Sequence, residues 1–327
     1  MRFDSVFTLC AMGALLAVGA YGYLFDEPFV LTLAAKASIF ALAGSGLHIA
    51  LGYGGLVSLG HAAFFGIGGY AAGILASHAR NYEVMLTWPV EISGTTSLPI
   101  IWLISMLAAG LVSIPIGLVS LRTGGAYFIM ITLAFAQMFY YFAISWPAYG
   151  GEDGLSFYVR NSVGDLQTMN PWIWFLICYG VLVVALIFIG LMRRSRFGLA
   201  LAMAKENPVR LANIGVSPRK VLLAAFVLSA IVTGLAGALY ADLNRFISPA
   251  MLSWHMSGEI MVFVILGGVG RLGGAVVGAC LYILLEQVLG GITEYWQLPL
   301  GVILIVIVLM GSGGVAGLLD RKGKAHV

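Results

Sequence analysis

Long apolar stretches separated by short polar segments run along almost the whole chain. A helix that crosses a bilayer needs about 20 mostly apolar residues. A helix also satisfies its backbone hydrogen bonds within one segment, as the lipid interior requires. The pattern therefore predicts an all-α polytopic transmembrane helical bundle that forms a single domain over residues 1–327. About ten spans are expected, at residues 6–24, 30–50, 61–77, 99–120, 126–144, 172–192, 220–240, 259–270, 274–290 and 298–316.

The first apolar stretch has a second interpretation, as a secretory signal peptide, because it follows Arg2. Its apolar run is longer than a typical signal core, and no clear small-x-small cleavage site separates it from Asp26. We therefore expect a retained helix at 6–24.

The composition agrees with a membrane protein. Hydrophobic residues make up 61% of the chain and charged residues 9%, whereas a soluble domain is about half apolar and roughly a quarter charged. The 43 glycines suit helices that pack closely in lipid. Cys10, Cys178 and Cys280 lie in apolar runs without metal or redox spacing, so we expect buried thiols and no metal site.

The basic residues are distributed unevenly between the predicted spans. Segment 193–220 carries seven of the 17 Lys and Arg residues but only one of the 14 acids. Because Lys and Arg collect in cytoplasmic loops, we expect this segment inside the cell. Ten alternating spans then place both termini and 13 of the 17 basic residues on the cytoplasmic side, and the main loop outside is 145–171.

Segment 193–220 also contains helix start and stop signals. Asn207-Pro208 is a good N-cap followed by a residue suited to the first helical position, and Gly215 suits the left-handed residue after a helix end. Ser217-Pro218 repeats the start signal. We predict a helical extension of the sixth span, a short helix at 208–214 and a capped restart. The alternative is a solvated loop that only sets the topology.

A few strongly polar side chains lie inside the predicted spans, where such groups are usually functional. They are Lys36, His48, His61, Gln137 and Glu286. We expect His61 to make structural hydrogen bonds. Glu286 is the one candidate for a proton relay, but it lies near the outer end of its span without an evident partner, and Lys36 can likewise extend its ammonium outward.

Two glycine-rich breaks interrupt the apolar pattern, at 52–60 and 267–274. Broken helices line cavities in many transporters, although the first break also serves as a turn between spans. The two breaks occur in segments 30–144 and 220–316, each with four spans, which suggests an inverted repeat. As residues of a transport path we single out Gly52, Tyr53, Gly55, Ser58, His61, Tyr127 and Gln137.

Several motifs along the chain have a recognisable order. In segment 202–215 the pattern Ala-x-x-x-Glu-Asn-x-x-x-x-x-Ala-x-x-Gly is similar to the EAA-type coupling segment of ATP-binding-cassette (ABC) importers. Pro208 in this segment and Ala200 just before it depart from the usual residues. Seven further motifs lie at 51–70 (LGYGGLVSLGHAAFFGIGGY), 122–128 (RTGGAYF), 150–155 (GGEDGL), 194–198 (RSRFG), 226–230 (FVLSA), 234–240 (GLAGALY) and 266–274 (LGGVGRLGG). In this order the motifs resemble the LivM-type branched-chain amino acid permeases, and the resemblance covers roughly residues 30–317.

The resemblance implies a type II ABC importer permease, which is a transport subunit and not an enzyme. Its partners would be a LivH-type permease, two cytoplasmic ATP-binding subunits, an extracytoplasmic solute-binding protein and membrane lipid, but no nucleic acid. The chain contains no Gly-x-x-x-x-Gly-Lys-Ser/Thr phosphate loop. We therefore expect no cofactor on this chain, and we expect ATP with Mg²⁺ to bind to the ATPase subunits. The location implied by the resemblance is a bacterial inner membrane.

The resemblance also assigns residues to two contact surfaces. Coupling to the ATPase is expected through 204–215, by Ala204, Glu206, Asn207, Pro208, Arg210, Ala212 and Gly215. Outside the membrane, Glu152, Asp153, Asp165 and Asp242 are either solvated or pair with basic residues of the binding protein.

The family moves leucine, isoleucine and valine, and close relatives handle urea, amides or aromatic acids. Two other classes stay open: a proton-coupled secondary transporter that uses Glu286, and a passive channel. The first needs a carboxylate or ion site near the midplane, and the second needs no structured cytoplasmic segment.

Overall fold

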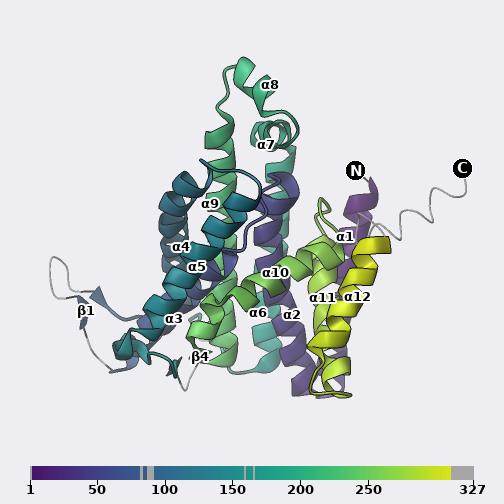
Figure 1. Ribbon diagram of the computed structural model, residues 1–327. Coiled ribbons are helices and arrows are strands. Elements are labelled where there is room, and N and C mark those ends of the chain that lie inside the picture. The colour runs from purple at the N-terminus through teal and green to yellow at the C-terminus, as the bar shows by residue number, and fades with distance from the viewer. Residues whose placement is uncertain (1, 82–83, 87–91, 158–159, 165, 311–327) are drawn as a thin grey trace, which may run out of the picture.

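The computed structural model describes residues 2–81, 84–86, 92–157, 160–164 and 166–310. Within these ranges, ten apolar helices coincide with the ten predicted spans (Figure 1). They are α1 (Arg2–Leu24), α2 (Pro28–His48), α3 (His61–Asn81), α4 (Leu98–Ser120), α5 (Ala126–Ile144), α6 (Pro171–Arg194), α9 (Pro218–Asn244), α10 (Trp254–Gly267), α11 (Gly274–Gly290) and α12 (Gln297–Met310). The prediction of an all-α polytopic bundle is confirmed.

The helices differ in length more than the sequence pattern indicates. Seven of the described helices are long and apolar enough to cross a membrane, whereas α10, α11 and α12 have 14, 17 and 14 residues. Helix α10 begins at Trp254, five residues before the predicted start of this span, because Ser253 caps it by accepting the N–H of Met256. It runs obliquely across the bundle (Figure 1). Residues 311–316 of the last predicted span lie outside the described ranges.

The first glycine-rich break is a change of helix type followed by a non-helical segment. Helix α2 ends in a π-helical turn, η1 (Ile49–Tyr53), and the chain is not helical again until His61. Single π-helical turns occur often at functional sites. The second break, between α10 and α11, contains Gly268 and Gly270, both with positive φ.

The helix contacts have the pattern of an internal two-fold repeat. Helix α3 packs on α4, and both pack across α9; in the same way α10 packs on α11, and both pack across α2. Helices α5 and α12 occupy matching outer places, and α2 and α9 contact each other at the centre. Since α2 and α9 run in opposite directions (Figure 1), the two halves are related as an inverted repeat.

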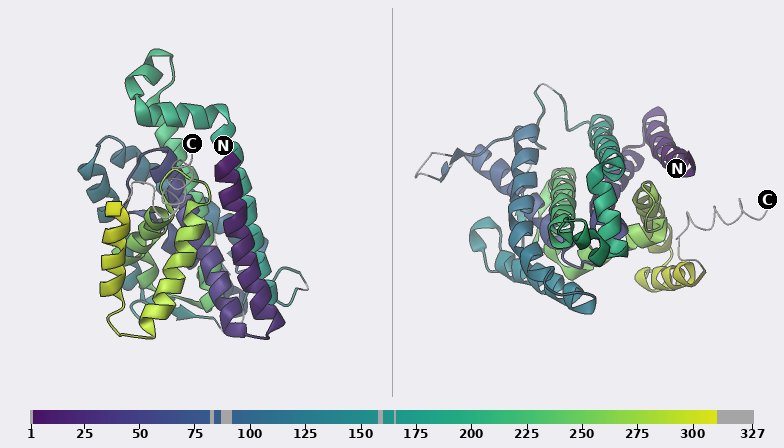
Figure 2. Two further views of the ribbon diagram at one scale, coloured as in Figure 1. Left: turned by 90° about the vertical axis from the view of Figure 1, so that its right-hand side faces the viewer. Right: turned by 90° about the horizontal axis from the view of Figure 1, so that it is seen from above.

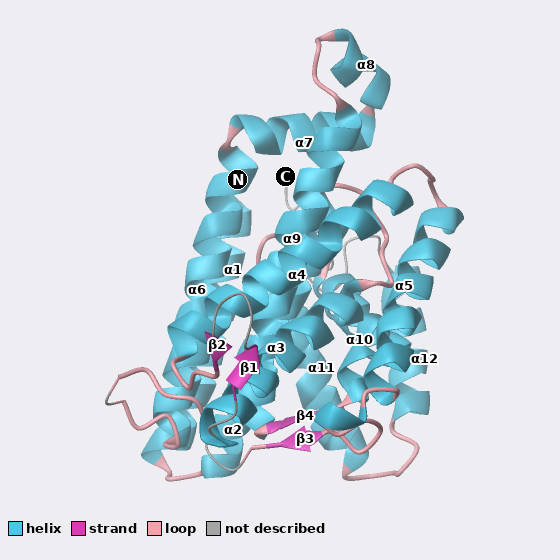
Figure 3. Cartoon of the chain, turned by 90° about the vertical axis from the view of Figure 1, so that its left-hand side faces the viewer, coloured by secondary structure: helices cyan, strands magenta, loops and turns pink. Residues whose placement is uncertain are grey.

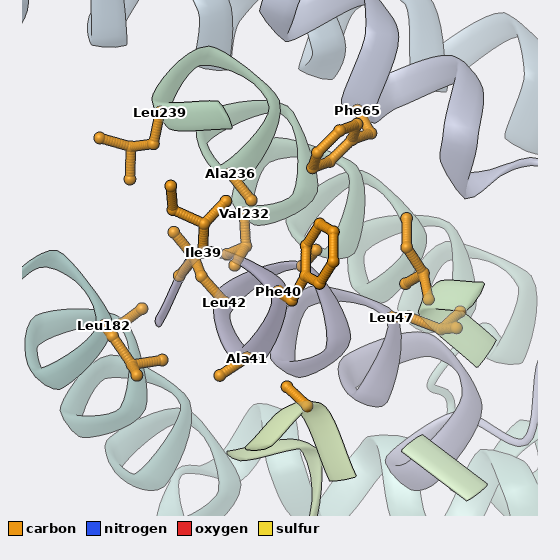
Figure 4. Close-up of a cluster of buried hydrophobic side chains, with 14 of the residues drawn as sticks. Ile39, Phe40, Ala41, Leu42, Leu47, Phe65, Leu182, Val232, Ala236 and Leu239 are labelled. Atoms are coloured by element: carbon orange, nitrogen blue, oxygen red, sulfur yellow. The ribbon is translucent and has the colours of Figure 1, made fainter. Parts of the chain in front are cut away.

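The centre of the bundle is a core between α2, α3, α6 and α9. Fully or almost fully buried side chains converge there, as Figure 4 shows for Ile39, Phe40, Leu42, Phe65, Leu182, Ala236 and Leu239. By contrast, α1, α4, α5 and α6 expose many large apolar side chains. In a soluble protein such surfaces would be a liability, but in a bilayer they face lipid or another membrane helix.

The short elements divide between the two ends of the bundle. Helices α7 (Arg196–Glu206) and α8 (Pro208–Asn213) project from one end, where α1 also begins (Figure 2). The strand pair β3 (Leu155–Ser156) with β4 (Phe246–Ile247) lies at the opposite end (Figure 3). The remaining short elements are β1 (Val84–Leu86) with β2 (Ile92–Ser93), and the 3₁₀ turns η2 (Pro147–Tyr149) and η3 (Pro249–Leu252).

Candidate functional site: the projecting helices and the break in α2

The predicted helical extension of the sixth span is present, but as a separate helix, because the chain turns sharply between α6 and α7 (Figure 2). Ser195 has extended backbone angles, φ −78° and ψ 170°. Its hydroxyl accepts the N–H of Gly198 at 3.3 Å and donates to the carbonyl of Met192 at 2.7 Å. A Cβ on Gly198 would meet the carbonyl oxygens of Met192 and Arg193, so the corner requires glycine at this position.

The predicted short helix at 208–214 is confirmed as α8, with both ends capped. The Asn207 side chain accepts the N–H of Arg210 at 3.0 Å, and Pro208 occupies the first helical position. At the other end Gly215 has φ +85°; its N–H donates to the carbonyl of Ala212, and the N–H of Val216 donates to that of Leu211. These two bonds form a Schellman motif. Ser217 makes no side-chain cap bond, so Pro218 alone marks the start of α9.

Most of the predicted coupling residues are exposed. They belong to the α7–α8 projection, which Figure 3 shows at one end of the bundle. The exposed ones are Glu206, Asn207, Pro208, Arg210, Ala212 and Gly215. Ala204 is buried and packs inward, so it supports the surface and does not contribute to it. The tip also exposes two apolar side chains, Val209 at 67% and Ile214 at 64%. An exposed apolar pair among charged residues on a rigid projection is suited to a protein partner.

The predicted path residues lie in three separate places. Gly52 and Tyr53 belong to η1 and line a cavity of about 370 Å³ together with Arg193, Lys205 and other residues of α6 and α7. Lys205 Nζ donates to the Gly52 carbonyl at 2.8 Å, and the Arg193 guanidinium lies 5.7 Å from the centre of the Tyr53 ring. The end of α2 and the projecting helices are therefore in direct contact.

The second place is the buried helix junction around His61. His61 Nε2 lies 2.7 Å from the hydroxyl of Ser229, which itself donates to the Gly46 carbonyl at 2.6 Å. Because the only hydroxyl proton of Ser229 is used in that bond, His61 donates from Nε2. The bond has the structural character predicted for His61. Ser58, three positions before His61, is buried and accepts the N–H of Gly60. Gly55, with φ +70°, lies instead against Lys205 beside the first place.

The third place is α5, at the edge of the molecule. Tyr127 is 71% exposed and Gln137 is partly buried. A path along this helix would need a second protein to close it.

Lys36 and Glu286, predicted to lack an evident partner, form an ion pair across the bundle. Lys36 Nζ of α2 lies 3.0 and 2.9 Å from the two carboxylate oxygens of Glu286 in α11, so neither group is isolated. Glu259, one turn into α10, lies near this pair and accepts a hydrogen bond from the Tyr282 hydroxyl. Sequence reasoning missed Glu259 because it placed this residue at the boundary of a span.

The four acids proposed for binding-protein contacts are not equivalent. Glu152 and Asp153 are exposed, and Asp165 lies outside the described residues. The exposure expected for Asp242 is wrong: its side chain is completely buried and accepts from Asn161 Nδ2 at 2.7 Å and from the Asn161 N–H at 3.4 Å. It cannot pair with a docked protein in this conformation.

Arg160 holds the same loop against the end of α9. Its guanidinium donates to the carbonyls of Asp242, Leu243 and Thr168 and stacks 4.5 Å from the centre of the Trp174 ring. Burial lowers the pKa of Arg160 from its usual value. Its five donors still favour this bonding to several carbonyls.

The fold and the projecting helices define a multi-pass membrane protein of the transport permease class. A family model described as "Branched-chain amino acid transport system / permease component" matches residues 29–311, and the chain belongs to this family.

Named relatives agree with this assignment. The chain is 25% identical over 307 residues to the high-affinity branched-chain amino acid transport system permease protein LivM of Escherichia coli (strain K12), covering 86% of the chain and 69% of the relative. LivM of Salmonella typhimurium has the same identity and coverage. LivH of Escherichia coli (strain K12) is 25% identical over 160 residues, covering 48% of the chain and 50% of the relative. No solved structure matches the chain.

Proposed function

We propose that the chain is a permease subunit of an ATP-driven importer and that a separate ATPase docks on α7 and α8. The observation that carries this proposal is the capped, projecting α7–α8 segment with its exposed face. The sequence contains no phosphate loop, so the nucleotide and its Mg²⁺ would be held by the partner chain. A passive channel would not need such a segment.

The remaining partners follow from the faces of the molecule. The apolar side chains that α5 exposes, with Tyr127 near its start, suit a second, LivH-type permease that completes a path between the two chains. Gln137 of the same helix is partly buried. A solute-binding protein would dock at the opposite end, near Glu152 and Asp153. In a bacterial inner membrane the α8 end, with the start of α1, would face the cytoplasm, as the positive charge of segment 193–220 favours.

Branched-chain aliphatic amino acids are the proposed substrates, supported by the description of the matching family. Urea, amides and aromatic acids are the alternatives within the same class. In such systems the solute-binding protein does much of the selecting, so binding of leucine, urea, amides and aromatic acids to that partner distinguishes them. Leucine binding is the expected result.

Uptake of labelled leucine into proteoliposomes, with and without the ATPase subunits, tests the proposed function. We expect uptake only with ATP and the ATPase subunits, and no loss when an ionophore collapses the proton gradient. The Lys36–Glu286 ion pair gives Glu286 a structural partner, which weakens its candidacy as a proton relay. Uptake driven by a proton gradient alone would overturn the proposal.

The coupling surface itself is tested by Glu206→Ala and Gly215→Val. The first removes an exposed carboxylate, and the second places a β-branched residue at φ +85°, which disrupts the C-terminal cap of α8. Both variants should insert normally and lose most ATP-driven uptake. Full-rate uptake by both would show that 204–215 is not the coupling segment.

A further inference from the structure

Lys205 joins the projecting helices to α2, one of the two central helices of the bundle. It lies 153 positions from Gly52 in sequence, yet its ammonium donates to the Gly52 carbonyl at 2.8 Å. Carbonyls in the last turn of a helix lack intrahelical donors, and a positive charge at that end is favoured by the helix dipole. The contact therefore satisfies the end of α2 with a group that belongs to α7.

The packing around this bond keeps the two elements together. The stem of Lys205 crosses Gly55 so closely that a Cβ there would lie 3.1 Å from Lys205 Cγ. Leu201, one helical turn earlier on the same face of α7, is fully buried and lies against Gly54. Arg193, at the end of α6, lies over the Tyr53 ring.

Two kinds of connection lead from α8 into the membrane. The covalent connections run through α7 to α6 and through Pro218 to α9. The non-covalent connections run through the packing of α7 and α8 on α9 and through Lys205 to η1 and α2. Helix α2 contacts α6, α9, α10 and α11, so a shift of its end reaches both halves of the inverted repeat.

We propose that Lys205 is a positioning residue that transmits displacement of the α7–α8 segment to the π-helical end of α2. The proposal rests on the proposed docking of an ATPase on this segment. The Lys205 ammonium touches neither ATP nor substrate; it keeps η1 in register with α7, so that movement of α7 during the ATP cycle also moves α2. Loss of the ammonium would let α7 move without α2, and ATP hydrolysis would continue without productive transport.

The test uses the full complex, with the second permease, the ATPase subunits and the binding protein, in proteoliposomes. Lys205→Met keeps the stem and removes the donor, Lys205→Arg keeps a donor, and Arg122→Met removes an exposed positive charge at the same end of the bundle. ATP hydrolysis and labelled leucine uptake are measured on the same preparations. A merely structural role of Lys205 would not change the ratio between the two rates.

We expect Lys205→Met to hydrolyse ATP at close to the wild-type rate while leucine uptake per ATP falls about tenfold, within the usual range of coupling between sites. Lys205→Arg should restore most of the ratio, and Arg122→Met should match the wild type. If leucine uptake per ATP hydrolysed is unchanged in Lys205→Met, the proposal is overturned. A parallel loss of hydrolysis and uptake also overturns it, because that result would place Lys205 in the docking surface.

The failure of the proposed function has a different signature, because the wild-type complex would then show no ATP-dependent uptake at all. If Lys205→Met does not form a folded complex, as judged by gel filtration, Lys205→Leu serves as the second variant. It removes both the charge and the donor and keeps an apolar side chain, and the same ratio of uptake to hydrolysis is measured. A wild-type ratio in Lys205→Leu overturns the proposal.

Discussion

Single residues of the same type have different roles according to where packing places them. Glu152 and Asp242 are both acids expected outside the membrane, but Glu152 is exposed and Asp242 is completely buried at the end of α9. A buried carboxyl group is stable only when donors satisfy it. Asn161 supplies two such donors from the loop that follows α5. Asp242 therefore fixes this loop to the bundle.

Asn161→Ala tests that role because it removes the shorter of the two bonds, at 2.7 Å, and leaves the buried Asp242 Oδ1 with only the backbone N–H of residue 161, at 3.4 Å. The free energy of unfolding of the protein in detergent should fall by about 1–3 kcal/mol. Glu152→Gln, on an exposed side chain, is the control and should change it by no more than about 0.5 kcal/mol. Equal stability of Asn161→Ala and the wild type would show that Asp242 does not depend on this bond.

At the scale of elements, the short helix α8 was predictable and the corner between α6 and α7 was not. The caps of α8 lie in consecutive residues, from Asn207 to Val216, so the sequence contains the whole signal. The corner depends on Ser195 turning its hydroxyl to Gly198, and a serine between basic residues is equally compatible with a continuous helix. Only the folded chain shows that Ser195 begins a new helix.

The same corner yields a prediction for Gly198→Ala. A methyl group there meets the carbonyl oxygens of Met192 and Arg193, which are backbone atoms and cannot rotate away. Stability should fall by about 1–3 kcal/mol, as for other overpacked sites, and α7 should lose its angle to α6. Thermal unfolding in detergent measures the fall in stability.

Gly180→Ala is the matched control, because no atom lies within 4 Å of a Cβ at that position in α6. It should leave stability unchanged or raise it by up to about 1 kcal/mol, since alanine favours a helix. Similar losses in both variants would contradict a specific role for the corner.

For the whole molecule, the inverted repeat explains why α2 and α9 are central and α5 and α12 are peripheral. Each half contributes one long helix that the other half packs across. The sequence suggested this arrangement through its two glycine-rich breaks, but no residue identity between the halves supported it. The contact pattern of the helices is what reveals it.

The crossing of α3 over α9 joins the two halves, and Gly237→Ala tests it. A Cβ on Gly237 would meet the backbone carbonyl of Phe65, so the two helices must separate to accept it. Close helix approach through small residues is a main source of association in lipid. We expect the free energy of unfolding in detergent to fall by about 1–3 kcal/mol. Less correctly folded protein should also insert into the membrane. Gly258→Ala, with open space around its Cβ, should behave as the wild type; the idea fails if the two variants are equally stable.

The sequence by itself determined the features that depend on neighbouring residues. The ten apolar helices follow from the need to satisfy backbone groups in lipid, and the caps of α8 follow from residues within a few positions of each other. The tertiary structure decided what pairs across the fold. Lys36 meets Glu286 over 250 positions, Lys205 meets Gly52 over 153, and Asn161 meets Asp242 over 81. The order of residues along the chain does not determine these contacts, because they arise when the helices pack. The same packing placed the predicted path residues apart from one another and buried Asp242.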